Sequence, residues 1–329
     1  MPKVSIVIPC YNAMRYLPET VRSVLAQTYE DYEVLIIDDG STEYSEAGTL
    51  EDWVQALDHP KIRLIRQENL GLAGARNTGI RQSAGDYIAL LDADDLWHPT
   101  KLEKQVALLD QHPQVGVVYA WSELIDAQGL STGRVLNPTA EGRIWESLLE
   151  QNLIGGGSVP LLRRSCLEQS GLFDLNLRSF VEDWDLWLRL APLTEFKVVK
   201  EILIYYRQLD SSASMDWTRM EQSYLLVLEK AFANAPPALQ HKKGKCYGLV
   251  NLYLAWRPLK GQSPSPTASW RFLRQAIAQY PQVMSLPEFW RLSLSILLTQ
   301  CLGGDIYRQG IALTHELRRR LKRLTAPAP

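Results

Sequence analysis

The stretch LLDADDLWHP, from Leu90 to Pro99, runs from apolar residues directly into three carboxylates, Asp92, Asp94 and Asp95. The apolar residues before the acids, IALL at 88–91, are typical of a buried strand. Carboxylates this close together repel one another unless water, a cation or a ligand offsets their charge. The stretch therefore predicts a buried strand whose carboxyl end carries a polar site.

On either side of this strand, short apolar strands alternate with amphipathic helices. The expected strands are residues 4–9, 32–41, 61–67, 86–92 and 115–121, and the expected helices are residues 16–29, 73–85 and 99–113. This alternation predicts right-handed crossovers and an α/β fold, with a mostly parallel central sheet flanked by helices. In such sheets ligands bind beyond the carboxyl ends of the strands.

Three of the expected strand ends carry polar groups, and we expect them to line one rim. Asp92 and Asp94 suit Mg²⁺ or Mn²⁺, which prefer carboxylate oxygens, but Asp is also common in turns and helix caps. Asp39 follows the second strand and could bind a base or ribose, or serve only as a turn residue. Tyr11 follows the first strand and could stack on a base or simply pack against its neighbours.

Two further segments carry groups that could act in catalysis. Arg76 lies in a Gly-rich segment that lacks the spacing of the common phosphate loops, and it could bind an anion or form a surface ion pair. Glu182 and Asp183 lie among aromatic residues, where desolvation raises a carboxyl pKa toward that of a useful base. The alternative is a capping cluster at a helix N-terminus, where the helix dipole favours acidic residues.

Composition excludes several classes of protein. The chain has 329 residues, 46% hydrophobic and 22% charged, with a net charge of −2. That charge argues against a general nucleic-acid-binding protein. The four cysteines are far apart, which predicts reduced thiols rather than a disulfide framework or a zinc site. No apolar run reaches the ~18 residues of a spanning helix, so we expect a cytoplasmic protein.

The sequence pattern changes near residue 210, from alternating strands and helices to helices alone. We expect a catalytic domain at residues 1–214, with a nucleotide-binding half at 1–120 and an acceptor-binding half at 121–214. Residues 215–329 are expected to form a helical C-terminal region. Its last helix carries a basic cluster at residues 318–323 beside leucines. This cluster predicts peripheral contact with an anionic membrane, at the inner face of the plasma membrane, or else a solvated helix end that suits its dipole.

Six motifs in order resemble those of family 2 glycosyltransferases: VSIVIPCYN, IIDDGST, NLGLAGARNTG, LLDADDLWHP, GLFDLNL and EDWDLWLRL. The resemblance covers roughly residues 1–214. It implies the Rossmann-like GT-A fold, a nucleotide-diphospho-sugar donor (a UDP-sugar is favoured), a divalent Mn²⁺ or Mg²⁺ and a glycan or lipid-linked acceptor. The QxxRW motif of processive synthases is absent, which favours single transfer. The His that many relatives carry near Leu209 is also absent, so metal coordination would be weaker or completed by water.

The resemblance also implies a role for individual residues. It places Pro9, Tyr11, Asp39, Arg76 and Asp92 at the donor nucleotide, and Asp94 and Asp92 at the metal. Asp183 would be the catalytic base, with Glu182 as the second candidate. Gly156, Gly157 and Trp184 would contact the acceptor. The metal would stabilise the leaving diphosphate, and one in-line displacement by a base-activated hydroxyl would invert the anomeric centre.

Two alternative functions are a sugar nucleotidyltransferase and a non-catalytic scaffold. A sugar nucleotidyltransferase shares the parallel sheet, but it would normally show a Gly-rich N-terminal signature that VIPCYNAMRYLPE lacks. A non-catalytic scaffold that binds nucleotide sugars is the second alternative. The intact Asp92, Asp94 and Asp183 argue against it.

Overall fold

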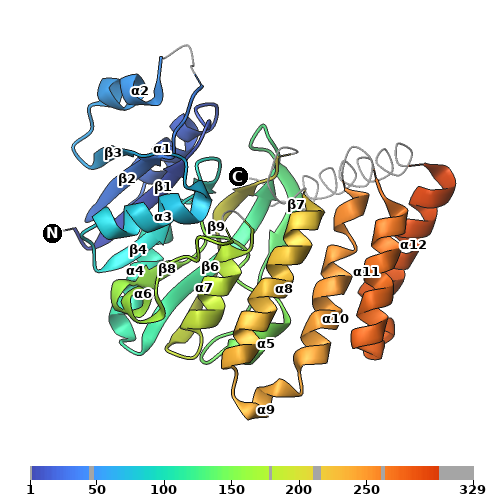
Figure 1. The fold of residues 1–329 in the computed structure, drawn as a ribbon. Helices are drawn as coiled ribbons and strands as arrows, with labels where there is room; N and C mark the ends of the chain where they lie inside the picture. The colour runs from blue at the N-terminus through green and yellow to red at the C-terminus, as the bar shows by residue number, and fades with distance from the viewer. Residues whose placement is uncertain (1, 44–47, 178–179, 210–215, 261–263, 304–329) are drawn as a thin grey trace, which may run out of the picture. The chain divides into compact units, whose positions relative to one another are not determined.

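The computed structural model describes residues 2–43, 48–177, 180–209, 216–260 and 264–303 (Figure 1). The basic cluster at residues 318–323 and the helix expected there lie outside the described residues. The chain divides into two compact units. The first comprises Met1–Gly129, Arg134–Trp145 and Leu153–Arg207, and the second comprises Leu130–Gly133, Glu146–Asn152 and the described chain after Arg207.

The first unit contains a nine-stranded sheet. Its order is β3 (Ile62–Arg66), β2 (Tyr32–Asp38), β1 (Val4–Cys10), β4 (Tyr87–Leu90), β8 (Leu161–Arg163), β6 (Val115–Ile125), β9 (Glu195–Arg207) and β5 (Leu96–Trp97), and β7 (Ser131–Leu136) pairs with β6. β3, β2, β1 and β4 are parallel, as are β6 and β9. β8 runs antiparallel to both of its neighbours, and β5 runs antiparallel to β9. The expected α/β class is confirmed, with the continuous parallel run in the β3–β4 half.

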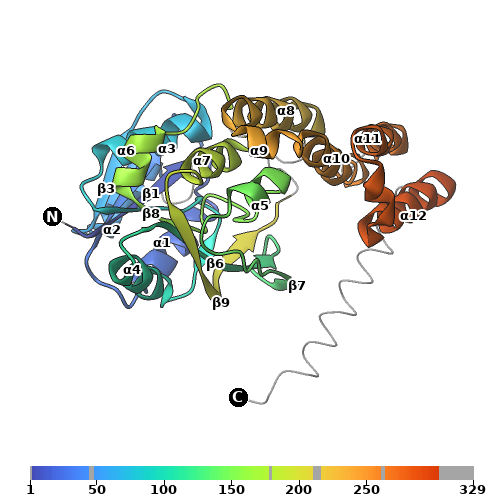
Figure 2. The same cartoon turned by 90° about the horizontal axis from the view of Figure 1, so that it is seen from below.

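Helices cover both faces of this sheet. They are α1 (Leu17–Leu25), α3 (Gly71–Gln82), α4 (Lys101–Gln111), α6 (Arg164–Ser170) and α7 (Glu182–Leu190), and α2 (Leu50–Leu57) lies near β3. Figure 2 shows the sheet between α3, α6 and α7 on one side and α1 and α4 on the other. All seven residues of the central strand β1 are therefore buried, whereas the edge strand β3 has no fully buried residue.

The register of the parallel strands brings their carboxyl ends together. Cys10 at the end of β1 pairs with Asp38 at the end of β2, and Val7 of β1 pairs with Leu90 at the end of β4. The residues that follow these ends, including Tyr11, Asp39 and Asp92, therefore emerge along one edge of the sheet. This confirms the rim expected from the sequence.

Apart from the start of β7, the described part of the second unit is helical, as expected. It contains most of α5 (Trp145–Glu150), together with α8 (Trp217–Asn234), α9 (Pro237–Gln240), α10 (Lys243–Leu254), α11 (Pro266–Gln279) and α12 (Pro287–Leu302), and two short 3₁₀ turns at Arg257–Leu259 and Pro281–Ser285. α10 packs against α8 and α11, and α11 packs against α12. None of the helices within the described ranges combines the length and apolar character needed to cross a bilayer.

Candidate active site

The acidic turn at residues 92–95 is held by side chains from several elements of the first unit. The hydroxyl of Thr20, on α1, shares its proton between the carbonyl oxygens of Ala93 and Asp95, both at 2.9 Å. The backbone N–H of Asp92 donates to Oγ of Ser158 at 3.0 Å. The backbone of the turn is thereby fixed while Asp92 and Asp94 stay partly exposed at the rim.

Arg207, the last residue of β9, also contacts this turn and joins it to α1. It is 3% exposed. Its backbone N–H donates to Oδ1 of Asp95 at 2.8 Å, its Nε donates to the carbonyl of Asp94 at 2.7 Å, and its Nη2 pairs with Glu19 at 2.7 Å. The sequence reasoning missed Arg207. An arginine that ends the apolar and aromatic run LIYYR was the available signal.

The carboxylates of the turn carry more negative charge than their surroundings offset. Burial, with the neighbouring charge of Asp92, raises the pKa of Asp94 to about 6. Burial and the charges of Asp94 and Asp92 raise the pKa of Asp95 well above its usual range. Among the described residues no three His, Cys, Asp or Glu side chains are arranged to hold a metal by themselves. Crowded carboxylate oxygens nevertheless fit a hard divalent cation that keeps positions open for phosphate or water.

Arg76 joins the acidic turn to α7 from within the core. Its side chain is 1% exposed, and its two terminal nitrogens lie 2.6 Å from Oδ1 of Asp92 and 2.5 Å from Oε1 of Glu182. Burial disfavours the guanidinium charge, but the two carboxylates outweigh it and hold the pKa of Arg76 above its usual value. The alternative of a surface ion pair is therefore wrong, because Arg76 is buried and pairs with Glu182, 106 residues further along the chain.

Gly157 makes this bridge possible. A Cβ atom placed on Gly157 would lie only 2.3 Å from Nη2 of Arg76 and 2.7 Å from its Cζ. A Cβ on Gly156 would lie 3.3 Å from Cε2 of Tyr206. Burial raises the pKa of Tyr206, and the nearby carboxylates of the turn raise it further. Gly157 is thus required by the packing of Arg76, and Gly156 lies beside a tyrosine close to the acids.

The two acids at the start of α7 have different surroundings. Glu182 is 4% exposed and is bound to Arg76. Burial raises the pKa of Glu182 to about 7, although the charge of Arg76 opposes this shift. Asp183 is partly exposed, and its Oδ1 accepts a hydrogen bond from the N–H of Trp184 at 2.6 Å. Only Asp183 therefore combines a place at the helix start with access to solvent.

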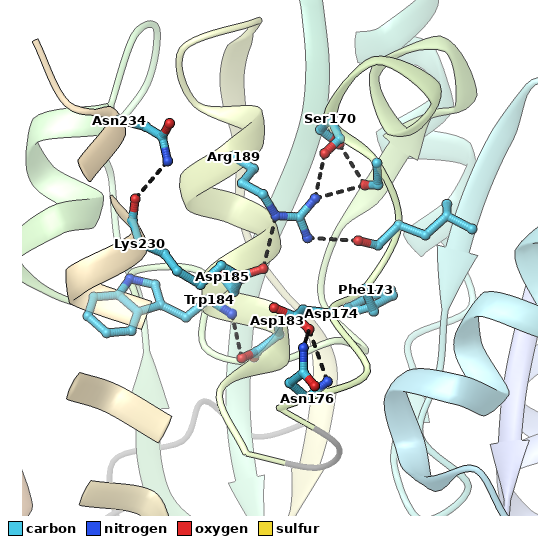
Figure 3. Close-up of polar contacts among 12 residues, drawn as sticks. Ser170, Phe173, Asp174, Asn176, Asp183, Trp184, Asp185, Arg189, Lys230 and Asn234 are labelled. Atoms are coloured by element: carbon cyan, nitrogen blue, oxygen red, sulfur yellow. Dashed lines mark hydrogen bonds and ion pairs between the residues drawn. The ribbon is translucent and has the colours of Figure 1, made fainter. Parts of the chain in front are cut away.

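Residues on α7 and α3 fix the loop at residues 170–173. Arg189, on α7, pairs with Asp185 at 2.9 Å and also donates to the carbonyls of Ser170, Gly171 and Leu172 (Figure 3). Asn77, on α3, exchanges two hydrogen bonds of 2.9 Å with the backbone of Phe173. The ring of Phe173 lies 5.3 Å from the guanidinium of Arg76. The GLFDLNL motif thus supports the site through packing and backbone contacts.

The remaining expected residues differ in how accessible they are. Tyr11 is 54% exposed just beyond β1, whereas Pro9 is buried within that strand. Oδ1 of Asp39 accepts hydrogen bonds from Gln67 at 2.6 Å and from the N–H of Leu70 at 2.9 Å, and Oδ2 accepts one from the N–H of Gly71 at 2.9 Å. Asp39 therefore organises the start of α3, the helix that carries Arg76.

Trp184 lies in the core, with 0% of its surface exposed. Seven of the nine residues of α7 are buried, Leu186 on the side opposite Trp184 among them, so the helix is enclosed on nearly all sides. In this structure no face of the Trp184 ring is open to an acceptor sugar.

Comparison with curated proteins finds relatives that match nearly two thirds of the chain. An uncharacterized glycosyltransferase of Rickettsia felis is 33% identical over 219 residues, which are 63% of this chain and 34% of that protein. One of Rickettsia typhi is 33% identical over 218 residues, covering 65% of this chain and 66% of the relative. This chain thus spans about a third of the length of the Rickettsia felis relative.

Solved structures extend the likeness over nearly the whole chain. Staphylococcus aureus TarS 1–349 in complex with UDP-GlcNAc has a TM-score of 0.63 at 17% identity, covering 97% of this chain and 92% of that one. The mannosyltransferase PcManGT of Pyrobaculum calidifontis, in complex with GDP-Man and Mn²⁺, has a TM-score of 0.59 at 20% identity, covering 98% and 87%. At these identities the likeness establishes the fold, and it confirms the GT-A class.

The family profile described as Glycosyl transferase family 2 matches residues 5–171, about half of the chain. The matched span contains β1, β2, the Arg76 helix and the acidic turn that together form the rim. This chain therefore belongs to glycosyl transferase family 2.

Proposed function

We propose that this chain transfers a glycosyl group from a nucleotide-diphospho-sugar, with a UDP-sugar favoured, to a hydroxyl of a glycan or lipid-linked acceptor. The transfer is non-processive and inverts the anomeric centre. One observation carries the proposal. The acidic turn of the donor-binding half is joined through buried Arg76 to Glu182, the neighbour of Asp183, at the start of α7.

Donor binding rests on groups that leave the sheet at its rim. Tyr11 presents an exposed ring on which a nucleobase can stack. Asp39 is 3% exposed, and Oδ2, which accepts one hydrogen bond from Gly71, is the oxygen that a base N–H would reach. Asp94, together with Asp92, would hold Mn²⁺ or Mg²⁺. When bound, the ion would stabilise the negative charge of the departing diphosphate.

The proton of the acceptor hydroxyl goes to Asp183. Glu182 is the poorer base, because its carboxylate is bound to Arg76 in the interior. Asp183 is partly exposed in the first turn of α7, where an acceptor hydroxyl can approach its carboxylate from solvent. The hydroxyl oxygen then attacks the anomeric carbon as the bond to the diphosphate breaks. No protein nucleophile takes part, so a single displacement inverts the centre.

An Asp183→Asn variant tests this assignment. It should bind UDP in the presence of Mn²⁺ as the unaltered chain does, measured by calorimetry, and it should lose release of nucleoside diphosphate from the donor sugar in the presence of acceptor. The matched control is Asp31→Asn, an exposed acid at the amino end of β2, opposite the rim, which should keep its activity. Transfer that survives in Asp183→Asn would contradict the assignment of the base.

The same measurements separate the alternatives. A non-catalytic scaffold would bind nucleotide sugars but release no diphosphate from any member of a panel of UDP- and GDP-sugars with glycan acceptors. A sugar nucleotidyltransferase would instead form pyrophosphate from a nucleoside triphosphate and a sugar phosphate. UDP binding that is unchanged without divalent ions would remove the metal role of Asp94.

A further inference from the structure

Helix α12 in the second unit carries apolar side chains on two opposite faces, with Arg291 paired to Glu288 at 3.1 Å on its exposed side. Its inward side chains, including Phe289, Leu292 and Ile296, are buried. On the opposite face it exposes large apolar residues to 39–63%: Trp290, Leu294, Leu297, Leu298 and Leu302. Their spacing of three to four residues places them on one side of the helix, and we call them the α12 stripe. A helix that is apolar on both sides is normally covered on both sides.

The size of the α12 stripe argues against a second copy of the chain as its cover. A helix of 16 residues is about 24 Å long and presents a strip roughly 10 Å wide, or about 240 Å². A stable protein interface buries about 800 Å² on each partner. A lipid surface needs no matching shape, and it accepts a narrow apolar strip that lies in its plane.

The charge of the neighbouring sequence indicates which lipid. Residues 304–329 directly follow α12 and contain six cationic residues and two acidic ones, and five of the cations fall within residues 318–323. A basic segment close in sequence to an apolar strip favours anionic lipids, because cations attract phosphate headgroups while apolar groups enter the acyl boundary. Trp290 suits this boundary, since its indole N–H already donates to the carbonyl of Met284 at 2.9 Å.

We propose that the α12 stripe lies on an anionic lipid surface, with Trp290 and the four leucines inserted to the level of the upper acyl chains. The docking surface is independent of the transfer site. Its evidence comes from the second unit, and nothing in the proposed reaction requires it.

Flotation of the full chain with lipid vesicles tests the proposal. The chain should float with phosphatidylcholine vesicles that contain phosphatidylglycerol and bind less to phosphatidylcholine alone. A Leu294→Ser, Leu298→Ser variant should bind about tenfold more weakly, because two side chains lose their transfer into the boundary. The control, Leu130→Ser with Leu226→Ser, changes two leucines that are exposed to 54% and 42% outside the stripe, and it should float like the unaltered chain.

Other results would overturn the proposal. One is equal flotation of the Leu294→Ser, Leu298→Ser variant and of the Leu130→Ser, Leu226→Ser control. Another is failure of the unaltered chain to float. A third is a dimer of the unaltered chain, detected by light scattering, that is lost in the Leu294→Ser, Leu298→Ser variant. Flotation that depends on Arg318, Arg319 and Arg320 while the stripe variant binds normally would also overturn it. UDP binding with Mn²⁺, measured on the same samples, should be unchanged in every variant. A failure of the lipid proposal is thereby distinguished from a failure of the proposed reaction.

Discussion

Replacement of Gly157 by alanine should damage the site although the change adds only a methyl group. The φ of Gly157 is outside the left-handed region, so the backbone itself accepts alanine. Without a clash, Gly→Ala changes stabilise a protein by about 0.4–1 kcal/mol through the unfolded chain. Here the new Cβ would lie 2.3 Å from Nη2 of Arg76, so the guanidinium must move by roughly 1 Å to reach an ordinary contact distance.

The displaced guanidinium cannot keep both of its carboxylate partners. In the unaltered chain the guanidinium lies 2.6 Å from Asp92 and 2.5 Å from Glu182, and the side chain is almost fully buried. A hydrogen bond to a charged group contributes about 1.5–3 kcal/mol, and an uncompensated buried charge costs more. We therefore expect the Gly157→Ala variant to lose about 2–4 kcal/mol of unfolding free energy, together with most of its transfer activity.

Urea denaturation of paired variants measures this effect. Gly156→Ala is the matched control, because its Cβ would meet only Cε2 of Tyr206 at 3.3 Å and should change the unfolding free energy by less than about 1 kcal/mol. In an Arg76→Ala background, Gly157→Ala should be nearly neutral, since the atoms that it displaces are gone. The reasoning would be refuted if both glycine variants behaved alike, or if the loss persisted without Arg76.

Three further perturbations address separate parts of the site. Arg207→Lys should weaken Mn²⁺-dependent UDP binding as well as lower stability, measured by calorimetry and urea denaturation, because lysine cannot contact both Asp94 and Glu19. Glu182→Gln should flatten the pH dependence of the unfolding free energy. Burial raises the pKa of Glu182 to about 7 in the native state, against about 4.5 in the unfolded state. In the unaltered chain this group therefore favours the native state most below pH 4.5, and its contribution is lost as the pH rises to about 7. Tyr11→Ala should weaken UDP binding by about 1–3 kcal/mol with unfolding unchanged, whereas Tyr11→Phe keeps the stacking face.

Each of these has a result that would contradict it. UDP binding that stays normal in Arg207→Lys while only stability falls would limit Arg207 to the fold. A Glu182→Gln variant with the same pH profile as the unaltered chain would show that the carboxyl does not titrate in this range. Equal UDP binding by Tyr11→Ala and Tyr11→Phe would place the base elsewhere.

Most strands and helices of the first 120 residues followed from local patterns, although α2 and β5 were not predicted. The expected strand at residues 4–9 is β1, the expected helix at residues 99–113 contains α4, and the polar ends of β1, β2 and β4 meet at one edge. β8 was not predicted, because its three residues are too few to show a period. Its antiparallel pairing with β4 and β6 interrupts the parallel sheet, and no local signal specifies that pairing.

The sequence by itself determined the α/β class, the rim of polar strand ends and the acids at residues 92–95, since periodicity and strand direction act over a few residues. Only the tertiary structure decided how those residues are used. Arg76 meets Glu182 across 106 residues, and Arg207 meets Asp95 across 112. The same packing directs Glu182 inward, leaves Asp183 partly exposed and buries Trp184. Such contacts depend on which surfaces the folded chain brings together, and burial then sets which carboxylates keep their charge.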